Sequence, residues 1–257
     1  MPRFCANISL MFSEVELPER FAAAARAGFR AVEMQFPYAY PPELLADRAR
    51  AAGVEVVLIN MPAGAQAGDR GIGCLPSRAA EFRDAVGSAL AYARALGCRR
   101  VNCLSGIAPA RADGAALRAA YVSNLRFAAA RLHPSEIELL IEPQNTRTFP
   151  GVFLHNTADA VSIIDEVGAP NLRLQYDVFH MQVMEGDLSR TLRENLAHIG
   201  HIQVADVPDR HEPGSGEINF PFLFGWIDRL GYPGWIGAEY VPAAATEAGL
   251  EWARPYL

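Results

Sequence analysis

The 257-residue sequence contains no lysine, and all 23 of its basic residues are arginines. Enzymes that form a Schiff base through a lysine, enzymes that hold pyridoxal phosphate through a lysine, and P-loop nucleotide-binding proteins are therefore excluded. A compositional bias toward alanine and arginine is a sufficient cause of this absence. The chemical exclusion holds whatever the cause.

Paired cysteines and long apolar runs are also missing. The four cysteines, Cys5, Cys74, Cys98 and Cys103, form no CxxC pair. They indicate reduced, mostly buried thiols and a cytoplasmic protein. No apolar run approaches the roughly 18 residues of a membrane-spanning helix, and the segment MPRFCANISLMF lacks a signal-peptide cleavage site. The formal net charge of -6 argues against nucleic acid or an anionic membrane as a partner.

Short apolar segments alternate with longer segments of helical spacing along the whole chain. Strands are predicted at 3–10, 30–35, 54–60, 100–104, 136–142, 171–177, 198–204 and 235–239, and helices at about 16–27, 42–52, 77–96, 114–132, 157–167, 187–196 and 219–230, with a short helix at the end. Eight such units in one chain predict a closed (β/α)8 TIM barrel, α/β in class, as a single domain over 1–257. An open doubly wound sheet would need a glycine fingerprint after the first strand, where the sequence has Met11-Phe12-Ser13-Glu14 instead.

Oxygen donors mark the ends of the last four predicted strands. The apolar run Leu139-Leu140-Ile141 ends in Glu142 before Pro143, which cannot continue a strand. Asp177, Gln203 and Glu239 lie at or near the ends of the next three strands. Barrel enzymes carry their functional groups at this end, and clustered carboxylates repel one another unless a cation is present. Oxygen ligands favour Mg²⁺ or Mn²⁺ over Zn²⁺. The alternative is that polar strand ends occur here by coincidence.

Three further side chains are candidates for substrate binding. His180, three residues after Asp177, is suited to bond a substrate hydroxyl or to orient a ligand, unless it is incidental. Arg70, in the glycine-rich loop 64–73, is suited to clamp a substrate carboxylate, unless it is only a surface residue. Arg210 begins the segment RHEPGSGE, which offers either an anion site or a simple turn. Three asparagines in or near strands are open to a core or a substrate role: Asn7, Asn60 and Asn102.

A divalent ion between two glutamates suits proton transfer next to a carbonyl group. One glutamate removes a proton from carbon, the other returns it to the adjacent carbon, and the metal stabilises the enediolate between them. This chemistry gives isomerisation or epimerisation without an organic cofactor. Two other functions remain open, namely a metal-dependent lyase or dehydratase on the same scaffold and a non-catalytic protein that binds sugar acids.

The segments LLIEPQNTRTFPGVFL, LQYDVFHMQ, HIGHIQVADVPDRHEPGSGEINF and WIGAEY together resemble the hydroxypyruvate isomerase family of xylose isomerase-like TIM barrels. The loop AGDRGIGCLPSR is also similar, so the resemblance runs over nearly the whole chain. It implies the conversion of hydroxypyruvate to 2-hydroxy-3-oxopropanoate (tartronate semialdehyde) with one divalent metal ion. It also implies that Glu142 and Glu239 are the acid/base pair and bind the metal together with Asp177 and Gln203.

Related families are distinguished by particular residues. Ketose 3-epimerases resemble this barrel but carry a histidine at the position of Gln203, which points away from them. Endonuclease IV-like barrels need several additional histidine ligands and a basic face, and this sequence indicates neither. A close relative in the same family, 2-oxo-tetronate isomerase, acts on a four-carbon acid and shares the quoted motifs. Barrels of this size commonly self-associate, so a dimer or higher homo-oligomer is expected.

Overall fold

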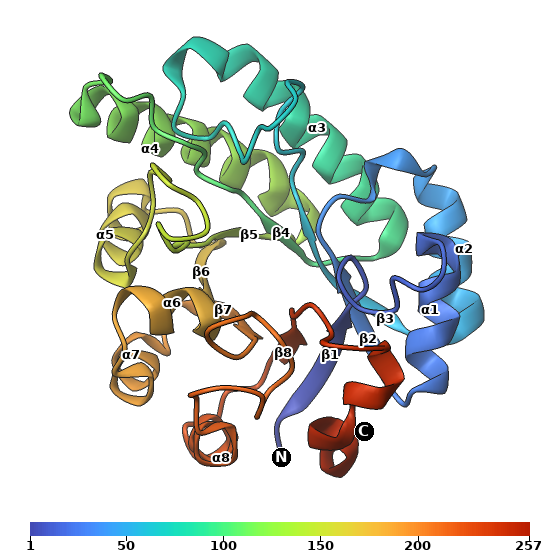
Figure 1. The fold of residues 1–257 in the computed structure, drawn as a ribbon. Helices are drawn as coiled ribbons and strands as arrows, with labels where there is room; N and C mark the ends of the chain where they lie inside the picture. Colours follow the sequence, from blue (N-terminus) through green and yellow to red (C-terminus); the bar gives the residue numbers. More distant parts are fainter.

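Eight parallel strands close into a barrel in chain order, with β8 pairing back onto β1 in the computed structural model of residues 1–257 (Figure 1). The strands are β1 Arg3–Asn7, β2 Ala31–Met34, β3 Glu55–Asn60, β4 Arg100–Asn102, β5 Glu138–Ile141, β6 Leu172–Asp177, β7 Ile199–Val204 and β8 Trp235–Ala238. The predicted TIM barrel is therefore confirmed, and each strand lies inside the segment assigned to it. The observed strands are shorter than predicted at one or both ends.

Helices surround this barrel on the outside (Figure 1). They are α1 Leu17–Arg26, α2 Pro42–Ala52, α3 Ala79–Leu96, α4 Gly114–Leu132, α5 Thr157–Val167, α6 Val178–Met184, α7 Leu188–Asn195 and α8 Phe220–Arg229. Helix α6 is absent from the sequence prediction, because its seven residues are too few for a helical period to be recognised. The predicted last helix is instead a pair of 3₁₀ helices, η4 Thr246–Gly249 and η5 Glu251–Tyr256. Pro255 lies inside η5 and disfavours an α-helix there.

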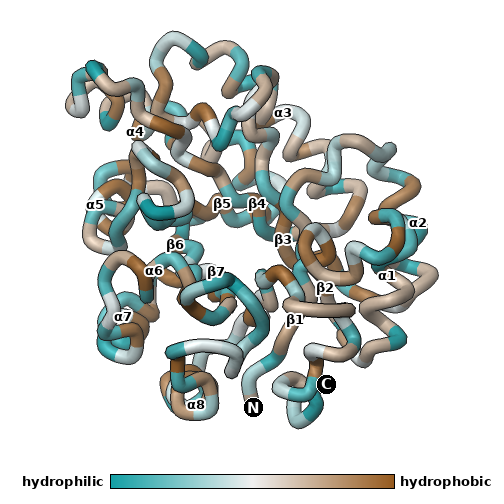
Figure 2. Tube along the Cα trace, viewed as in Figure 1, coloured by the Kyte–Doolittle hydropathy of each residue, from teal (hydrophilic) through white to brown (hydrophobic).

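The large apolar core lies between the strands and the helices, and hydrophobic residues alternate with hydrophilic ones along the helices accordingly (Figure 2). The inside of the barrel is different. A small apolar cluster that includes Cys5, Val57 and Leu140 fills part of it. Buried polar side chains fill the rest, which is where the candidate site begins. The four cysteines are buried free thiols, as predicted. None of the helices combines the length and apolar character needed to span a bilayer.

Candidate active site

Three carboxylates gather at the carboxyl end of the barrel. Glu142 directly follows β5, Asp177 is the last residue of β6, and Glu239 directly follows β8. Their side chains are buried although ionisable groups normally remain in water. The Asp177 Oδ1 atom accepts a hydrogen bond from the Phe179 backbone N–H and so caps α6. This cap fixes the carboxylate and leaves its second oxygen, Oδ2, facing the other charged groups.

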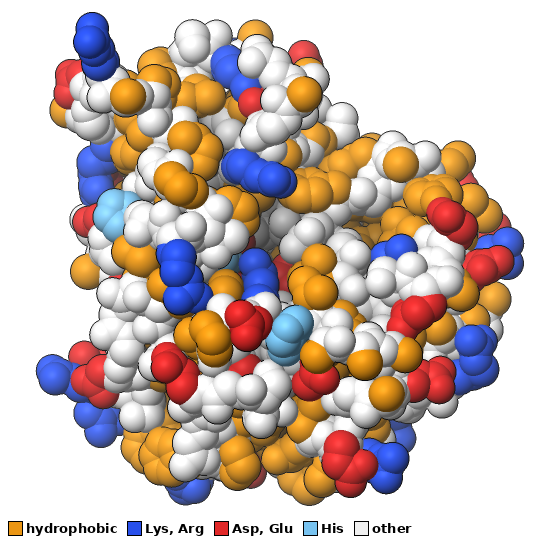
Figure 3. Space-filling view, in the orientation of Figure 1, with side chains coloured by type: hydrophobic (Ala, Val, Ile, Leu, Met, Phe, Trp, Pro, Cys, Tyr) orange, Lys and Arg blue, Asp and Glu red, His pale blue; other side chains and the backbone are white.

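A cavity of about 70 Å³ opens beside two of these carboxylates, Glu142 and Glu239. Arg70 and Arg210 line it as well, together with the Phe149 ring. The space-filling view is hollowed near its centre, with basic and acidic side chains at the edge of the hollow (Figure 3). The structure thus brings four of the residues selected from the sequence to one small, mostly polar cavity.

The fourth predicted metal ligand, Gln203, is oriented differently. It pairs in register with Asp177, but its side-chain oxygen accepts a hydrogen bond of 2.6 Å from Gln175 Nε2. Its amide nitrogen donates to Glu33 Oε1 at 2.7 Å. Gln203 therefore lies in the barrel interior beside the carboxylates, with its amide engaged by other side chains.

His180 is a buried, neutral side chain whose tautomer follows from its neighbours. The Thr148 N–H donates to Asn145 Oδ1, so the Asn145 amide nitrogen must face the His180 ring. That nitrogen and the Asn145 backbone N–H both approach His180 Nδ1, at 2.6 and 3.2 Å. Nδ1 is thus an acceptor and Nε2 carries the proton. Burial, followed by the charge of Arg210, lowers the pKa of His180 well below its ordinary value.

The Nε2–H group of His180 has no hydrogen-bond partner although it is buried. It lies 3.7 Å from Glu142 Oε1 and 3.5 Å from Asp177 Oδ2. An unpaired buried donor is costly unless something accepts from it. Because this nitrogen carries a proton, His180 is better suited to donate to a substrate oxygen than to ligate a metal. The sequence placed His180 beside a loop, whereas it lies within α6.

Arg210 crosses the mouth of the barrel. Its Nη2 atom donates to Glu239 Oε2 and, at 3.3 Å, to Asp177 Oδ2. It also lies over the Phe179 ring, with its central carbon 5.1 Å from the ring centroid. The Arg210 guanidinium therefore supplies positive charge beside two of the three carboxylates.

The loop that carries Arg210 is organised around Asp206. Its carboxylate accepts hydrogen bonds from the backbone N–H groups of Gly214, Gly216 and Ile218 at 2.8–3.1 Å. A Cβ atom at Gly216 would lie 1.9 Å from the Val207 carbonyl oxygen, so only glycine fits. The GSG segment is thus a turn closed by a carboxylate. Its backbone donors are already used and do not form an anion site.

Arg70 reaches the cavity from the loop that follows β3. It is exposed, and its guanidinium carbon lies 5.8 Å from the centroid of the Phe149 ring. The next residue, Gly71, has φ +101°, and a Cβ there would be 2.5 Å from the Leu104 carbonyl oxygen. This close approach holds the loop against the end of β4. Arg70 therefore combines the two alternatives from the sequence, since it is a surface side chain that also lines the cavity.

Burial and mutual repulsion raise the affinity of the carboxylates for protons. Burial raises the pKa of Glu239 to about 7, although Arg210 opposes the shift. Burial, then the charges of Glu239 and Asp177, raises the pKa of Glu142 well above its ordinary value. Burial likewise raises the pKa of Asp177, against Arg210. Oxygen donors held together at such a cost fit a hard divalent cation such as Mg²⁺ or Mn²⁺.

These shifts predict how the stability of the metal-free protein depends on pH. A carboxyl group whose pKa is raised in the folded state binds more protons folded than unfolded, so its stabilising contribution is lost as pH rises. For Glu239 the window runs from its ordinary value near 4.5 to about 7, and it corresponds to roughly 3 kcal/mol. Urea unfolding between pH 4.5 and 8 should show wild-type stability falling relative to Glu239→Gln. Parallel pH profiles would contradict the shift.

Several polar residues around the carboxylates were missed or left open by sequence reasoning. The Asn102 Nδ2 atom donates to Glu142 Oε2 at 2.9 Å, and Gln35 Nε2 donates to Glu239 Oε1 at 2.8 Å. Asn7 Nδ2 also donates to Glu239 Oε1, at 3.1 Å. Asn7 and Asn102 thus contact the candidate catalytic groups. The signal for Gln35 was the alternation of Glu33 and Gln35 along the second predicted strand, which turns both side chains inward.

Comparisons with known proteins point to one family. A family model described as "Xylose isomerase-like TIM barrel" matches residues 21–256. The chain is 50% identical to a 2-oxo-tetronate isomerase of Cupriavidus necator, over 100% of this chain and 99% of that protein. It is 49% identical to a hydroxypyruvate isomerase of Escherichia coli K12, over the full length of both. A crystal structure described as AP endonuclease, family 2, from Brucella melitensis matches with a TM-score of 0.97 and 45% identity, covering 100% of this chain and 99% of that one.

Proposed function

Because the chain belongs to the xylose isomerase-like TIM-barrel family, we propose that it interconverts hydroxypyruvate and 2-hydroxy-3-oxopropanoate with the help of one divalent metal ion. Its family and its class of enzyme, an isomerase, are those that the sequence motifs indicated. The observation that carries the proposal is the pair of buried glutamates, Glu142 and Glu239, facing one small cavity.

The two glutamates are suited to move one proton between adjacent carbons. In the forward direction one carboxylate takes a proton from C3 of hydroxypyruvate, and a protonated carboxyl group delivers a proton to C2. The hydroxyl proton on C3 moves to the oxygen on C2, so the C3 hydroxyl group becomes an aldehyde and the C2 carbonyl becomes a hydroxyl group. No atom is lost. Strands β5 and β8 stand three places apart around the barrel, which lets the glutamates approach the substrate from different sides.

A metal ion would be held by oxygen atoms of Glu142, Asp177 and Glu239, with Gln203 as the fourth ligand that the resemblance implies. When bound, it supplies a Lewis acid that polarises the substrate carbonyl and neutralises the charge that develops on oxygen. Arg210 already makes ion pairs with Asp177 and Glu239, so it supplies positive charge at the same place. The buried Nε2–H group of His180 is oriented to donate to a substrate oxygen.

The substrate carboxylate has two candidate partners, Arg70 and Arg210, both of which line the cavity. We expect Arg70→Ala to raise KM for hydroxypyruvate by roughly tenfold with little change in kcat, because a charged hydrogen bond to the substrate is lost. The measurement is steady-state kinetics. Arg83→Ala is the matched control, since Arg83 also stacks on an aromatic ring, Phe127, but does not line the cavity. An unchanged KM in Arg70→Ala would remove Arg70 from the site.

A second candidate substrate is 2-oxo-tetronate, favoured by the 50% identity to a 2-oxo-tetronate isomerase. It differs from hydroxypyruvate by one additional CHOH unit, and the same proton transfer serves both acids. Parallel assays of the two acids with added Mg²⁺ or Mn²⁺ test the proposal, and the larger kcat/KM identifies the preferred one. Absence of turnover with both acids would refute the proposed function.

A further inference from the structure

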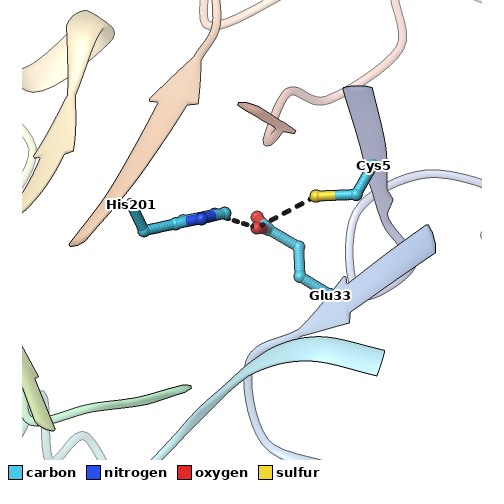
Figure 4. Close-up of side chains that lie close together, drawn as sticks. All are labelled: Cys5, Glu33 and His201. Carbon is cyan, nitrogen blue, oxygen red and sulfur yellow. Dashed lines mark hydrogen bonds and ion pairs between the residues drawn. The ribbon is translucent and has the colours of Figure 1, made fainter. Parts of the chain in front are cut away.

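Glu33 is a fully buried carboxylate in the middle of the barrel, below the three carboxylates of the candidate site. It projects inward from β2, and Cys5 of β1 and His201 of β7 approach it from two sides (Figure 4). Glu33 is neither one of the four predicted metal ligands nor one of the two candidate acid/base groups. Burying a charge in this way is unfavourable unless every oxygen lone pair finds a donor.

Cysteine, glutamate and histidine at such close quarters suggest a metal site, but the distances argue for hydrogen bonds instead. His201 Nε2 and Glu33 Oε2 are 2.6 Å apart. Two ligands on one tetrahedral zinc ion, each about 2.0–2.2 Å from the metal, would lie roughly 3.3 Å apart. A separation of 2.6 Å leaves room for a shared proton and not for an ion.

The two oxygens of Glu33 serve different groups. Oε2 accepts from His201 and, at 3.6 Å, from the Cys5 thiol. Oε1 accepts from Asn7 Nδ2 at 2.9 Å and from Gln203 Nε2 at 2.7 Å. Burial by itself raises the pKa of Glu33, but His201 and the amide donors outweigh it and leave the pKa below its ordinary value. The carboxylate is therefore held ionised as an acceptor for all four groups.

The Oε1 side of Glu33 connects directly to the candidate catalytic groups. Asn7 Nδ2 donates one hydrogen to Glu33 Oε1 and the other to Glu239 Oε1. The Ser9 N–H donates to Asn7 Oδ1, so the Asn7 amide cannot turn around. Asn7 thus links the buried carboxylate to Glu239 in one fixed geometry.

Glu33 Oε1, which accepts from Asn7, also orients Gln203. With its amide nitrogen bonded to Glu33, the Gln203 amide must keep its oxygen on the opposite side, because two acceptors would repel each other. That oxygen accepts a hydrogen bond of 2.6 Å from Gln175 Nε2, and a cation that used Gln203 as a ligand would take the place of this donor. The chain also provides space for the carboxylate, since a Cβ at Gly237 of β8 would lie 2.3 and 2.5 Å from its two oxygens.

We propose that Glu33 is a positioning residue: through Asn7 it orients Glu239, and by holding the Gln203 amide nitrogen it leaves the amide oxygen as the end that would be available to a metal ion. This inference rests on the proposed function. Under this proposal Glu33, inside the barrel, affects both metal affinity and proton transfer. It does not make Glu33 a catalytic residue, because Glu33 acts only through its two amide partners.

Two variants test this role by different routes. Glu33→Gln keeps the shape but offers one acceptor oxygen in place of two, so donors on one side lose their partner. Gly237→Ala keeps the charge but pushes the carboxylate out of place. Replacing a residue that orients metal ligands typically lowers metal affinity or activity by roughly 10–100-fold. We therefore expect both variants to weaken Mn²⁺ binding by roughly that factor and to lower kcat, with KM for hydroxypyruvate little changed.

The Mn²⁺ dissociation constant is measured by calorimetry without substrate, and the Tm of the metal-free protein is recorded in parallel. Cys5→Ala is the matched control, because Cys5 contacts only the Oε2 side and should leave the Mn²⁺ dissociation constant at the wild-type value. A wild-type Mn²⁺ dissociation constant in either test variant, with only Tm lowered, overturns the inference and makes Glu33 purely structural. Failure of the proposed function would appear earlier, as a wild-type protein that neither binds Mn²⁺ nor converts either acid.

Discussion

Replacing Glu142 by glutamine is expected to lower kcat for hydroxypyruvate by roughly 10²–10⁴-fold, the usual contribution of one general acid or base. The amide matches the carboxylate in shape, and Asn102 Nδ2 still finds an acceptor oxygen at this position. The loss therefore reports on the proposed roles of Glu142 in proton transfer and metal binding rather than on folding. Because Glu142 is buried beside Asp177 and Glu239, removing one charge should also raise the stability of the metal-free protein.

The matched control is Glu138→Gln on the same strand. Glu138 lies at the start of β5 and pairs with Arg100 at 3.3 Å, far from the cavity that Glu142 lines. Its replacement should leave kcat within about twofold, because partly exposed ion pairs contribute little. The measurement is the steady-state kcat of both variants with hydroxypyruvate. A Glu142→Gln enzyme with near wild-type kcat would exclude Glu142 from the acid/base pair, and Glu239→Gln is judged by the same standard.

Removal of divalent metal is expected to have the second large effect, a loss of activity of roughly 10³-fold or more. A metal ion at such a site contributes several kcal/mol to the transition state, and each 1.4 kcal/mol is about tenfold in rate. The oxygen donors of Glu142, Asp177 and Glu239 predict that Mg²⁺ or Mn²⁺ restores the rate. The same ions should raise Tm, because they relieve repulsion between buried carboxylates.

The measurement is turnover after dialysis against a chelator, followed by addition of each ion. Sodium chloride at equal ionic strength is the control for general screening of charge. Full activity in chelator-treated protein, with no response of Tm to Mg²⁺ or Mn²⁺, would leave the carboxylates without a metal. Arg210 would then be their sole counter-charge.

Both the barrel and the carboxylates at the carboxyl ends of its strands can be predicted from local sequence patterns. Apolar strands alternate with helices in a local pattern, and a polar residue directly after an apolar run must lie at a strand end. Glu142, Asp177 and Glu239 could therefore be located without knowing how the strands pair. Arg210 was selected from its segment, but only the structure shows it contacting Asp177 and Glu239.

The depth of a side chain inside the barrel could not be predicted in this way. Pairing between β6 and β7 shifts at Leu174/Gln175, and pairing between β2 and β3 shifts at Val32/Glu33. Such irregularities redirect side chains and leave no local sequence signal. The amide of Gln203 consequently meets Gln175 and Glu33, contacts that arise only when distant strands close the barrel.

The role of Asp206 could not be predicted either, because it depends on contacts that form only in the folded loop. Its carboxylate accepts from Gly214 and Gly216, so the glycines that suggested an anion site serve the chain's own aspartate. The GSG pattern alone is equally compatible with an external anion and with an internal one. Only the folded loop shows which of the two is present.

The central claim is that a proton moves between adjacent carbons of a small hydroxy-oxo acid with no atom lost. It is tested most directly by NMR of hydroxypyruvate labelled with carbon-13 at C3, incubated with the enzyme and Mg²⁺ in deuterium oxide. We predict that the signal of the labelled C3 shifts from that of a hydroxymethyl group to that of an aldehyde or its hydrate, that total label is conserved, and that Glu142→Gln slows the change by roughly 10²–10⁴-fold. Label released from the three-carbon skeleton, or a substrate signal that persists unchanged with hydroxypyruvate and with 2-oxo-tetronate alike, would contradict the claim.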